Sequence, residues 1–232
     1  MSRQFDILEK SIGHEFADVG LLHRALSHRS WINESDDEVS NERLEFLGDA
    51  VLGWVVADLV YSTFEEWDEG RLTDLRKILV NASALAGIAR EINLGDYLLL
   101  GNGEDATGGR EKEAILSDTL EAIIGAVYVD AGSNTAFDVV QRLISPRFLD
   151  APSQLDRLDQ KNRLQELLAA LRLPSPSYLS TSQGPDHDKE FSATVLVGGE
   201  VFGTGTGRSK KLAEKQAAGE AINRLAGRGP RA

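Results

Sequence analysis

The acidic residues of the segment NERLEFLGDA form the first group in this sequence whose spacing suggests chemistry. Glu42, Glu45 and Asp49 fall within about 60° of one another around a helix, on the face opposite its apolar stripe. That stripe consists of Leu44, Leu47, Val51 and Val55. Like charges at this spacing destabilise a helix by roughly 0.2 to 0.5 kcal/mol per pair, so a cluster of them needs compensation. Because Mg²⁺ prefers carboxylate oxygens, a bound cation is one way to provide it.

A second acidic helix is predicted over residues 110–132, where Asp118 and Glu121 lie three residues apart. Gly48 and Gly125 stand beside the two acidic faces, so the helices can approach closely there and bring both faces into one cluster. A solvated acidic face is the alternative for either helix taken alone. Neither segment contains Glu-x-x-His, which argues against a di-iron bundle. The apolar stripe opposite the second pair of acids consists of Leu116, Leu120, Ile123 and Val127.

Phe46 lies among the acids of the first helix, about 40° from Glu42 and away from the apolar stripe. A single chain offers it no obvious place to be buried. It is either half-exposed and covered by a loop or in contact with a second subunit, and periodicity does not decide between these alternatives.

The elements that must position these residues belong to a chain whose two parts differ in charge. The formal net charge of the 232 residues is −12, which by itself argues against a nucleic-acid ligand. However, residues 1–150 contain 13 Lys or Arg against 28 Asp or Glu, whereas residues 151–232 contain 12 against 9. The second part is therefore basic, and the net charge of the whole chain does not exclude a nucleic-acid ligand. All six prolines lie from Pro146 onward, so nothing interrupts long helices in the acidic part.

The patterns predict a multi-domain protein, with an all-α domain over residues 1–149, a linker over 150–158 and a small α+β domain over 159–228. The order expected in the second domain is α-β-β-β-α. Its predicted strands and helices cover residues 159–173, 177–183, 190–197, 200–207 and 208–227.

Composition excludes several classes of site. The sequence has no cysteine, so neither disulfides nor thiolate zinc sites are possible, and its four histidines show no metal-ligand spacing. The N-terminus lacks the apolar core of a signal peptide, and the longest apolar run is too short to span a bilayer. We therefore expect a soluble cytoplasmic protein with no membrane partner and no small-molecule organic cofactor.

Three motifs, in this order, resemble those of the ribonuclease III family. NERLEFLGDAVLG is similar to the family signature, and EAILSDTLEAIIGAVYVDAG to its second acidic helix. The segments LQELL, GPDHDKEF and GRSKKLAEKQAA are similar to a double-stranded RNA-binding domain. The resemblance covers nearly the whole chain and is to the bacterial form.

The resemblance implies a homodimeric endoribonuclease that hydrolyses both strands of an RNA duplex with Mg²⁺, or with Mn²⁺ as a substitute. The products would carry 5′-phosphate and 3′-hydroxyl ends, and the substrates would be precursor ribosomal RNA and other structured transcripts. Phe46 would insert into the neighbouring subunit, while Glu42 and Glu69 would support the site or contact RNA. The implied catalytic residues and metal ligands are Glu45, Asp49, Asp118 and Glu121.

The same resemblance implies recognition of the duplex by shape, sugar and phosphate. Helix residues would face one minor groove, a loop histidine a second, and lysines the intervening phosphates. Taken alone, the lysine pair is better explained as a solvated face and the histidine as an ordinary loop residue, but together with the α-β-β-β-α order they favour RNA binding. Many such domains carry a third lysine where this chain has Glu214, and the nearest base is Lys215. The implied RNA-binding residues are Asn162, Gln165, Glu166, His187, Lys210, Lys211 and Lys215.

Two other functions compete with this prediction. A non-catalytic double-stranded RNA-binding protein on the same scaffold should have lost an acid, whereas all four acids of the expected cluster are present. A helical phosphohydrolase of small molecules does not explain the basic C-terminal part.

Overall fold

The computed structural model describes residues 5–35, 39–148, 151–152, 155, 160–185 and 189–227. The chain divides into two compact units, Met1–Ala151 and Pro152–Ala232. Most of the predicted linker, residues 150–158, lies outside the described residues, so its extent stays a prediction. Within the part of the chain that the structure describes, no helix is both long and apolar enough to cross a membrane.

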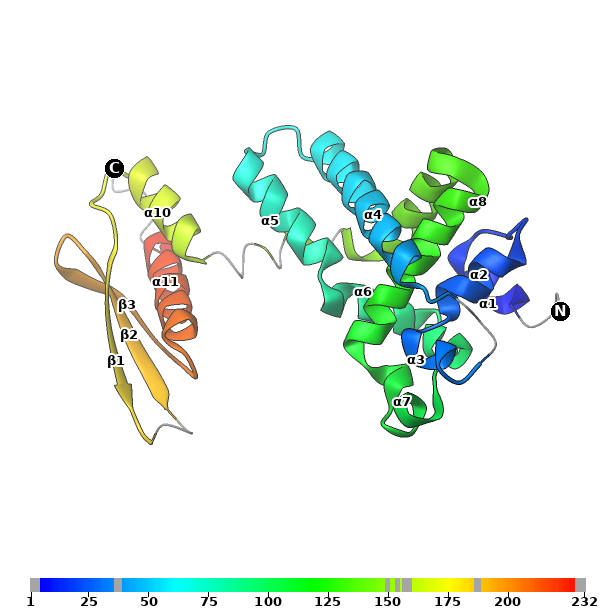
Figure 1. Cartoon of the computed structure of the whole chain (residues 1–232). Helices are drawn as coiled ribbons and strands as arrows, with labels where there is room; N and C mark the ends of the chain where they lie inside the picture. Colours follow the sequence, from blue (N-terminus) through cyan, green and yellow to red (C-terminus); the bar gives the residue numbers. More distant parts are fainter. Residues whose placement is uncertain are drawn as a thin grey trace. The chain divides into compact units, whose positions relative to one another are not determined.

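The first unit is helical, as predicted (Figure 1). Two short 3₁₀ turns, η1 (Leu94–Tyr97) and η2 (Gly109–Glu111), connect its later helices. The helices are α1 (Asp6–Ile12), α2 (Val19–Leu26), α3 (Arg29–Ile32), α4 (Glu42–Thr63), α5 (Glu69–Val80), α6 (Ala82–Glu91), α7 (Asn102–Ala106) and α8 (Glu113–Phe148).

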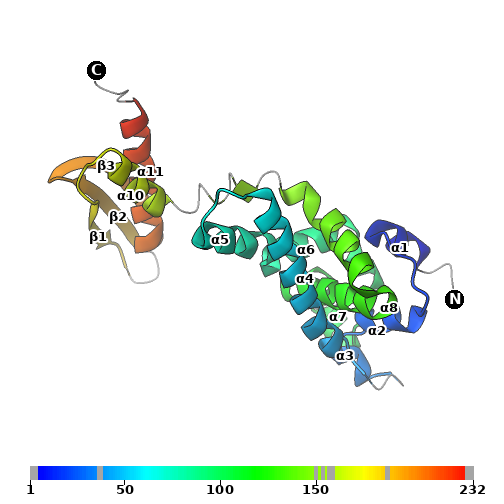
Figure 2. The ribbon, with the colours of Figure 1, turned by 90° about the horizontal axis from the view of Figure 1, so that it is seen from above.

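Helix α8 is the centre of this unit, and α4 lies along it (Figures 1 and 2). Its predicted apolar stripe is buried, as are most neighbouring positions before Val127, because other helices surround this segment. Gly132, with φ 81° and ψ −176°, interrupts the helix in the middle. Only glycine adopts such a conformation readily, so the second half of α8 can leave in a new direction.

The buried face of α4 is rotated from the one that periodicity predicted. Three of the four predicted stripe residues are buried, but Leu47 is only half-buried, and the buried face extends to Gly48, Leu52 and Val56. The reason is that α8 packs against the side of α4 that carries Gly48. The acids of α4 therefore flank its buried face instead of lying opposite to it, which leaves Glu45 half-buried.

The second unit has the predicted α-β-β-β-α order. Its elements are α10 (Gln160–Ala170), β1 (Ser177–Gln183), β2 (Glu190–Val197), β3 (Glu200–Gly207) and α11 (Lys210–Gly227). The three strands form one antiparallel sheet in the order β1-β2-β3, and both helices cover the same face of it (Figure 1). Leucines of α10, valines of β2 and alanines of α11 form the core between them.

Glycines on β3 allow α11 to lie directly on the strand. A Cβ atom at Gly203 would clash with the carbonyl oxygen of Ala217, and one at Gly205 with that of Ala213. The alternation of glycine and threonine in GTGTG therefore gives the strand a face without side chains, on which the alanine face of α11 packs.

Side chains of α11 also contact the outer edge of β3. The main-chain N–H of Thr206 donates to Gln216 Oε1 at 3.0 Å, and that of Thr204 donates to Glu220 Oε2 at 2.6 Å. Arg224 donates to the carbonyl oxygen of Val201. Because side chains four residues apart on a helix match the repeat of a strand, α11 satisfies successive groups along this edge.

Candidate functional site

The crossing of α4 and α8 positions the acidic residues. A Cβ atom at Gly48 would clash with the carbonyl oxygen of Glu121, and one at Gly125 with that of Leu44. The two helices thus touch through their main chains at this point. The close approach predicted from the two glycines is confirmed.

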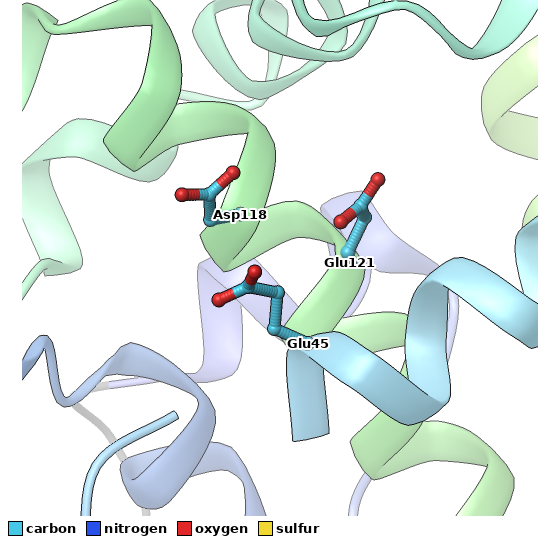
Figure 3. Close-up of side chains that lie close together, drawn as sticks. All are labelled: Glu45, Asp118 and Glu121. Atoms are coloured by element: carbon cyan, nitrogen blue, oxygen red, sulfur yellow. The ribbon is translucent and has the colours of Figure 1, made fainter. Parts of the chain in front are cut away.

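Three carboxylates meet at this crossing. Glu45 on α4 lies beside Asp118 and Glu121, which are on successive turns of α8 (Figure 3). One carboxylate oxygen from each lies within 4.8 Å of the other two, and all three side chains are half-buried. Asp49, one turn after Glu45, is exposed and does not belong to this triplet, although its charge acts on Glu121.

The pKa values of these acids reflect their crowding. Burial raises the pKa of Glu121 to about 7, and the charges of Asp49, Asp118 and Glu45 act in the same direction. Burial also raises the pKa of Glu45, and the charges of Asp118 and Glu42 raise it further. The site therefore disfavours its own full ionisation at neutral pH, and a cation placed among these oxygens reverses that preference.

Main-chain hydrogen bonds bring a basic segment to the start of α4. Ser27 pairs with Leu99 in an isolated bridge, and its carbonyl oxygen accepts the N–H of Asn41 at 2.9 Å. His28, the residue that follows, caps the N-terminus of α3. Its Nδ1 accepts the N–H of Ser30, so in the neutral form its proton is on Nε2. The sequence showed no metal-ligand spacing for this histidine and gave no sign that it lies near the acids.

His28 and Arg29 lie close enough to the acids to interact with them electrostatically. Burial lowers the pKa of His28, while Glu104, Asp118 and Glu42 oppose that effect. The charge of Arg29 acts to lower the pKa of Glu45 and so favours its carboxylate form. Only the tertiary structure reveals these neighbours, because they are far from Asp118 and Glu104 in the sequence.

The two predicted supporting acids occupy different places. Glu42, at the start of α4, accepts a hydrogen bond from Ser40 Oγ at 2.8 Å and lies close enough to Glu45 to raise its pKa. Glu69 begins α5 and accepts a hydrogen bond from Thr73 Oγ1 at 3.0 Å. Since α4 separates Glu69 from Glu45 by on the order of 25 Å of helix, Glu69 does not join the cluster of its own subunit.

Phe46 is 80% exposed, although it is a large apolar side chain. Trp54 and Tyr61, which follow along the same helix, are 47% and 74% exposed. Aromatic surface of this extent on a single helix is typical of an interface with another protein chain.

The predicted RNA-binding residues lie on several elements of the second unit. Asn162, Gln165 and Glu166 are exposed on α10, and Lys210 and Lys211 are exposed at the start of α11. His187 lies outside the described residues.

Lys215 has a different environment from the lysine pair. It is half-buried and lines a groove along β3, together with Leu212 and Gln216. Glu214, the position at which a base was missing, faces inward and pairs with Lys161 of α10. The position of Glu214 on the alanine-rich face of α11 was the available sequence signal for that orientation.

Comparisons with known proteins identify relatives of both units. Residues 18–148 match a family model described as ribonuclease-III-like, and residues 160–225 match the double-stranded RNA binding motif. The chain is 51% identical to Ribonuclease 3 of Thermobifida fusca, over 90% of this chain and 87% of that protein. It is 50% identical to Ribonuclease 3 of Streptomyces coelicolor, over 91% and 76% of the two chains.

A solved structure resembles the first unit. The nuclease domain of ribonuclease III from Campylobacter jejuni, described as flexible in a region involved in dimer formation, aligns with a TM-score of 0.59 and 46% identity. The alignment covers 62% of this chain and 99% of that domain.

Proposed function

The chain belongs to the ribonuclease III family and is an endoribonuclease specific for double-stranded RNA; we propose that it works as a Mg²⁺-dependent homodimer leaving 5′-phosphate and 3′-hydroxyl ends. The observation that carries the proposal is the meeting of Glu45, Asp118 and Glu121 at the α4–α8 crossing. Two acidic helices held in contact by glycines are well suited to a cation site and poorly suited to an unoccupied acidic surface.

The donor set fits Mg²⁺. It consists of carboxylate oxygens within 4.8 Å of one another. Burial, reinforced by the charges of neighbouring acids, raises the pKa of Glu121, and a divalent cation offsets both effects. Glu45, Asp118 and Glu121 would hold the ion, with Asp49 next to them. When bound, Mg²⁺ would act as a Lewis acid, lowering the pKa of a water molecule and neutralising charge on phosphate oxygens. Mn²⁺ also prefers oxygen ligands and is proposed as a substitute.

The protein residues around the cluster set its protonation and its shape. Glu121 must lose its proton before it can act as a ligand, so cation binding depends on pH near neutrality. The contact of Gly48 with the main chain of α8 fixes the separation of Glu45 from Asp118. Arg29 keeps positive charge near Glu45, where it favours the ionised carboxylate.

A homodimer is supported by the exposed aromatic side chains of α4. The described residues of one chain provide one such acidic cluster, and cutting both strands of a duplex requires two. Phe46 is proposed as the anchor that enters the neighbouring subunit, since its 80% exposure would otherwise leave a large apolar side chain in water. The dimer formation described for the Campylobacter jejuni nuclease domain supports a dimer for this chain as well.

The second unit is proposed to bring duplex RNA to the acidic first unit. It carries the excess of basic residues, and its exposed Lys210 and Lys211 lie at a helix N-terminus, where main-chain N–H groups also favour phosphate. Precursor ribosomal RNA, together with messenger and transfer RNA precursors that contain duplex regions, is the proposed class of substrate.

The activity is tested by incubating the protein with a long RNA duplex and Mg²⁺. We expect short duplex products with 5′-phosphate and 3′-hydroxyl ends, and no products in EDTA. Single-stranded RNA and duplex DNA are the matched substrates that should remain intact. Equal cleavage of duplex DNA would contradict the proposed specificity, and unchanged cleavage in EDTA would contradict the role of the cation.

A further inference from the structure

One carboxylate connects three elements of the second unit. The side chain of Glu214 on α11 is only 12% exposed. Its Oε2 accepts a hydrogen bond from Nζ of Lys161 on α10 at 2.8 Å, and its Oε1 accepts one from Oγ of Ser180 on β1 at 3.1 Å. Nζ of Lys210, one turn earlier on α11, lies 3.9 Å from Oε1. Glu214 thus holds lysine side chains from two different helices next to each other.

Lys161 has a second fixed contact. Its Nζ lies 4.4 Å from the centroid of the Tyr178 ring, whose negative face attracts an ammonium group. The side chain nevertheless remains 42% exposed. An ammonium held by a carboxylate and a ring has lost most of its freedom before any ligand arrives, which reduces the entropic penalty of binding.

The pairing keeps Glu214 ionised. The hydrogen bond from Lys161 lowers the pKa of Glu214 and outweighs the opposing effect of burial, and Ser180 and Lys210 contribute in the same direction. The carboxylate lies beneath its two partners, since Lys161 and Lys210 are 42% and 67% exposed. A phosphate approaching this surface therefore meets two ammonium groups before it meets the carboxylate.

We propose that Lys161 is a phosphate-binding residue of the RNA-binding unit and that Glu214 is a positioning residue that holds Lys161 beside Lys210. The charge that α11 lacks at position 214 is supplied from α10. Lys215 does not take this place, because it lines the groove along β3. Asn162, which is exposed and expected to face the minor groove, directly follows Lys161, so the two residues can contact one stretch of duplex. This inference rests on duplex binding by the second unit.

The role of Lys161 is tested with the full-length protein and a fluorescently labelled RNA duplex in EDTA, which prevents cleavage. The dissociation constant is measured by anisotropy at several salt concentrations. Lys161→Gln should weaken binding several-fold and reduce the slope of log Kd against log salt by about 0.7 to 0.9, as for one lost phosphate contact. Lys161→Arg should retain most of both. The matched control is Arg172→Gln, which removes a cation beyond the other end of α10 and should leave the slope nearly unchanged.

The role of Glu214 is tested by the sign of an effect. Glu214→Gln removes a negative charge near RNA, so simple electrostatics predicts tighter binding. A positioning role predicts the opposite, a Kd several-fold higher, because both lysines are released. In the Lys161→Gln background, most of that loss should disappear, since the two residues act through one contact. Tighter binding by Glu214→Gln would overturn the positioning role.

Thermal melting of the variants and duplex binding by the parent protein keep the possible outcomes distinct. Thermal melting establishes that each variant is folded, and if Glu214→Gln is not, the comparison of Lys161→Gln with Lys161→Arg still decides whether Lys161 binds phosphate. A parent protein that binds no duplex would refute the proposed function itself. Binding by the parent with an unchanged salt slope in Lys161→Gln would refute this inference alone.

Discussion

Gly48 and Gly125 face each other across the α4–α8 crossing, and each lies against the main chain of the opposite helix. A side chain at either position would separate the helices. The distance between Glu45 and the acids of α8 depends on this contact, so it links the packing of the first unit to its chemistry.

Gly48→Ala should therefore destabilise the protein and reduce cleavage together. The added Cβ atom clashes with the main chain of α8, and overpacking of this kind costs about 1 to 3 kcal/mol. Gly53→Ala is the control on the same helix, because its Cβ atom would have Arg76 as its nearest neighbour at 4.0 Å. Helix propensity predicts that this control is stabilised by up to about 1 kcal/mol. Thermal melts and duplex cleavage are measured on both variants, and equal behaviour would disprove the role given to the glycine contact.

Glu121→Gln should abolish cleavage while leaving duplex binding intact. The change removes one charge and one proposed ligand with almost no change in shape. In the parent protein, Mg²⁺ at about tenfold above its Kd should add about 1.4 kcal/mol of stability, and the variant should show much less. Melting temperatures with and without Mg²⁺, at matched ionic strength, measure this. Normal turnover by the variant would show that Glu121 is not required to hold the catalytic cation.

Without divalent cations, the stability of the first unit should fall as pH rises from about 4.5 to about 7. Glu121 has a pKa raised from its ordinary 4.5 to about 7, so over this range the folded state binds more protons than the unfolded state. By linkage, stability then decreases with increasing pH. Melts in EDTA at several pH values should show this slope in the parent and a smaller slope in Glu121→Gln. Identical slopes would indicate that another group titrates.

Phe46→Glu should convert the proposed dimer to monomers. A carboxylate in a desolvated aromatic contact is strongly unfavourable, whereas at an exposed surface it is harmless. Sedimentation velocity measures the change, with Tyr61→Glu as a second exposed aromatic position on α4 for comparison. If Phe46→Glu sediments as the parent does, Phe46 is not an interface anchor.

Removal of residues 152–232 should weaken RNA binding strongly at physiological salt and leave some cleavage at low salt. In the proposed division of roles, the second unit supplies the basic residues whose phosphate contacts would release counterions, and the first unit would rely on bound cations to accept phosphate. Anisotropy and cleavage at two salt concentrations test this. Undiminished affinity in the truncated protein would contradict the division of roles.

Periodicity predicted the element types and the strands of the second unit well, because alternation and helical repeat are local properties of a sequence. It predicted the buried face of α4 less well. The rotation of a helix depends on what packs against it, and the contact of Gly48 with Glu121 turns the helix so that Leu47 is only half-buried.

For the candidate site too, the sequence predicted what depends on local pattern and missed what depends on packing. The two pairs of acids and the two glycines indicated where the helices meet, but side-chain geometry leaves Asp49 outside the group formed by Glu45, Asp118 and Glu121. The pairing of Lys161 with Glu214 joins residues far apart in the sequence, and no spacing rule reports such a contact. His28 and Arg29 lie near the acids because the main chain of Ser27, just before them, pairs with that of Leu99. Such a pairing between distant segments cannot be predicted from residue spacing.

The hydrogen bonds between the edge of β3 and the side chains of Gln216, Glu220 and Arg224 have a consequence when several copies bind one substrate molecule. A long duplex gathers many copies of the RNA-binding unit side by side, at a local concentration far above that in bulk solution. Under such conditions a bare strand edge would invite one sheet to extend into the next and polymerise. Because α11 already occupies outward N–H groups of β3, that edge of the sheet is closed to a strand from a neighbouring copy on the same duplex.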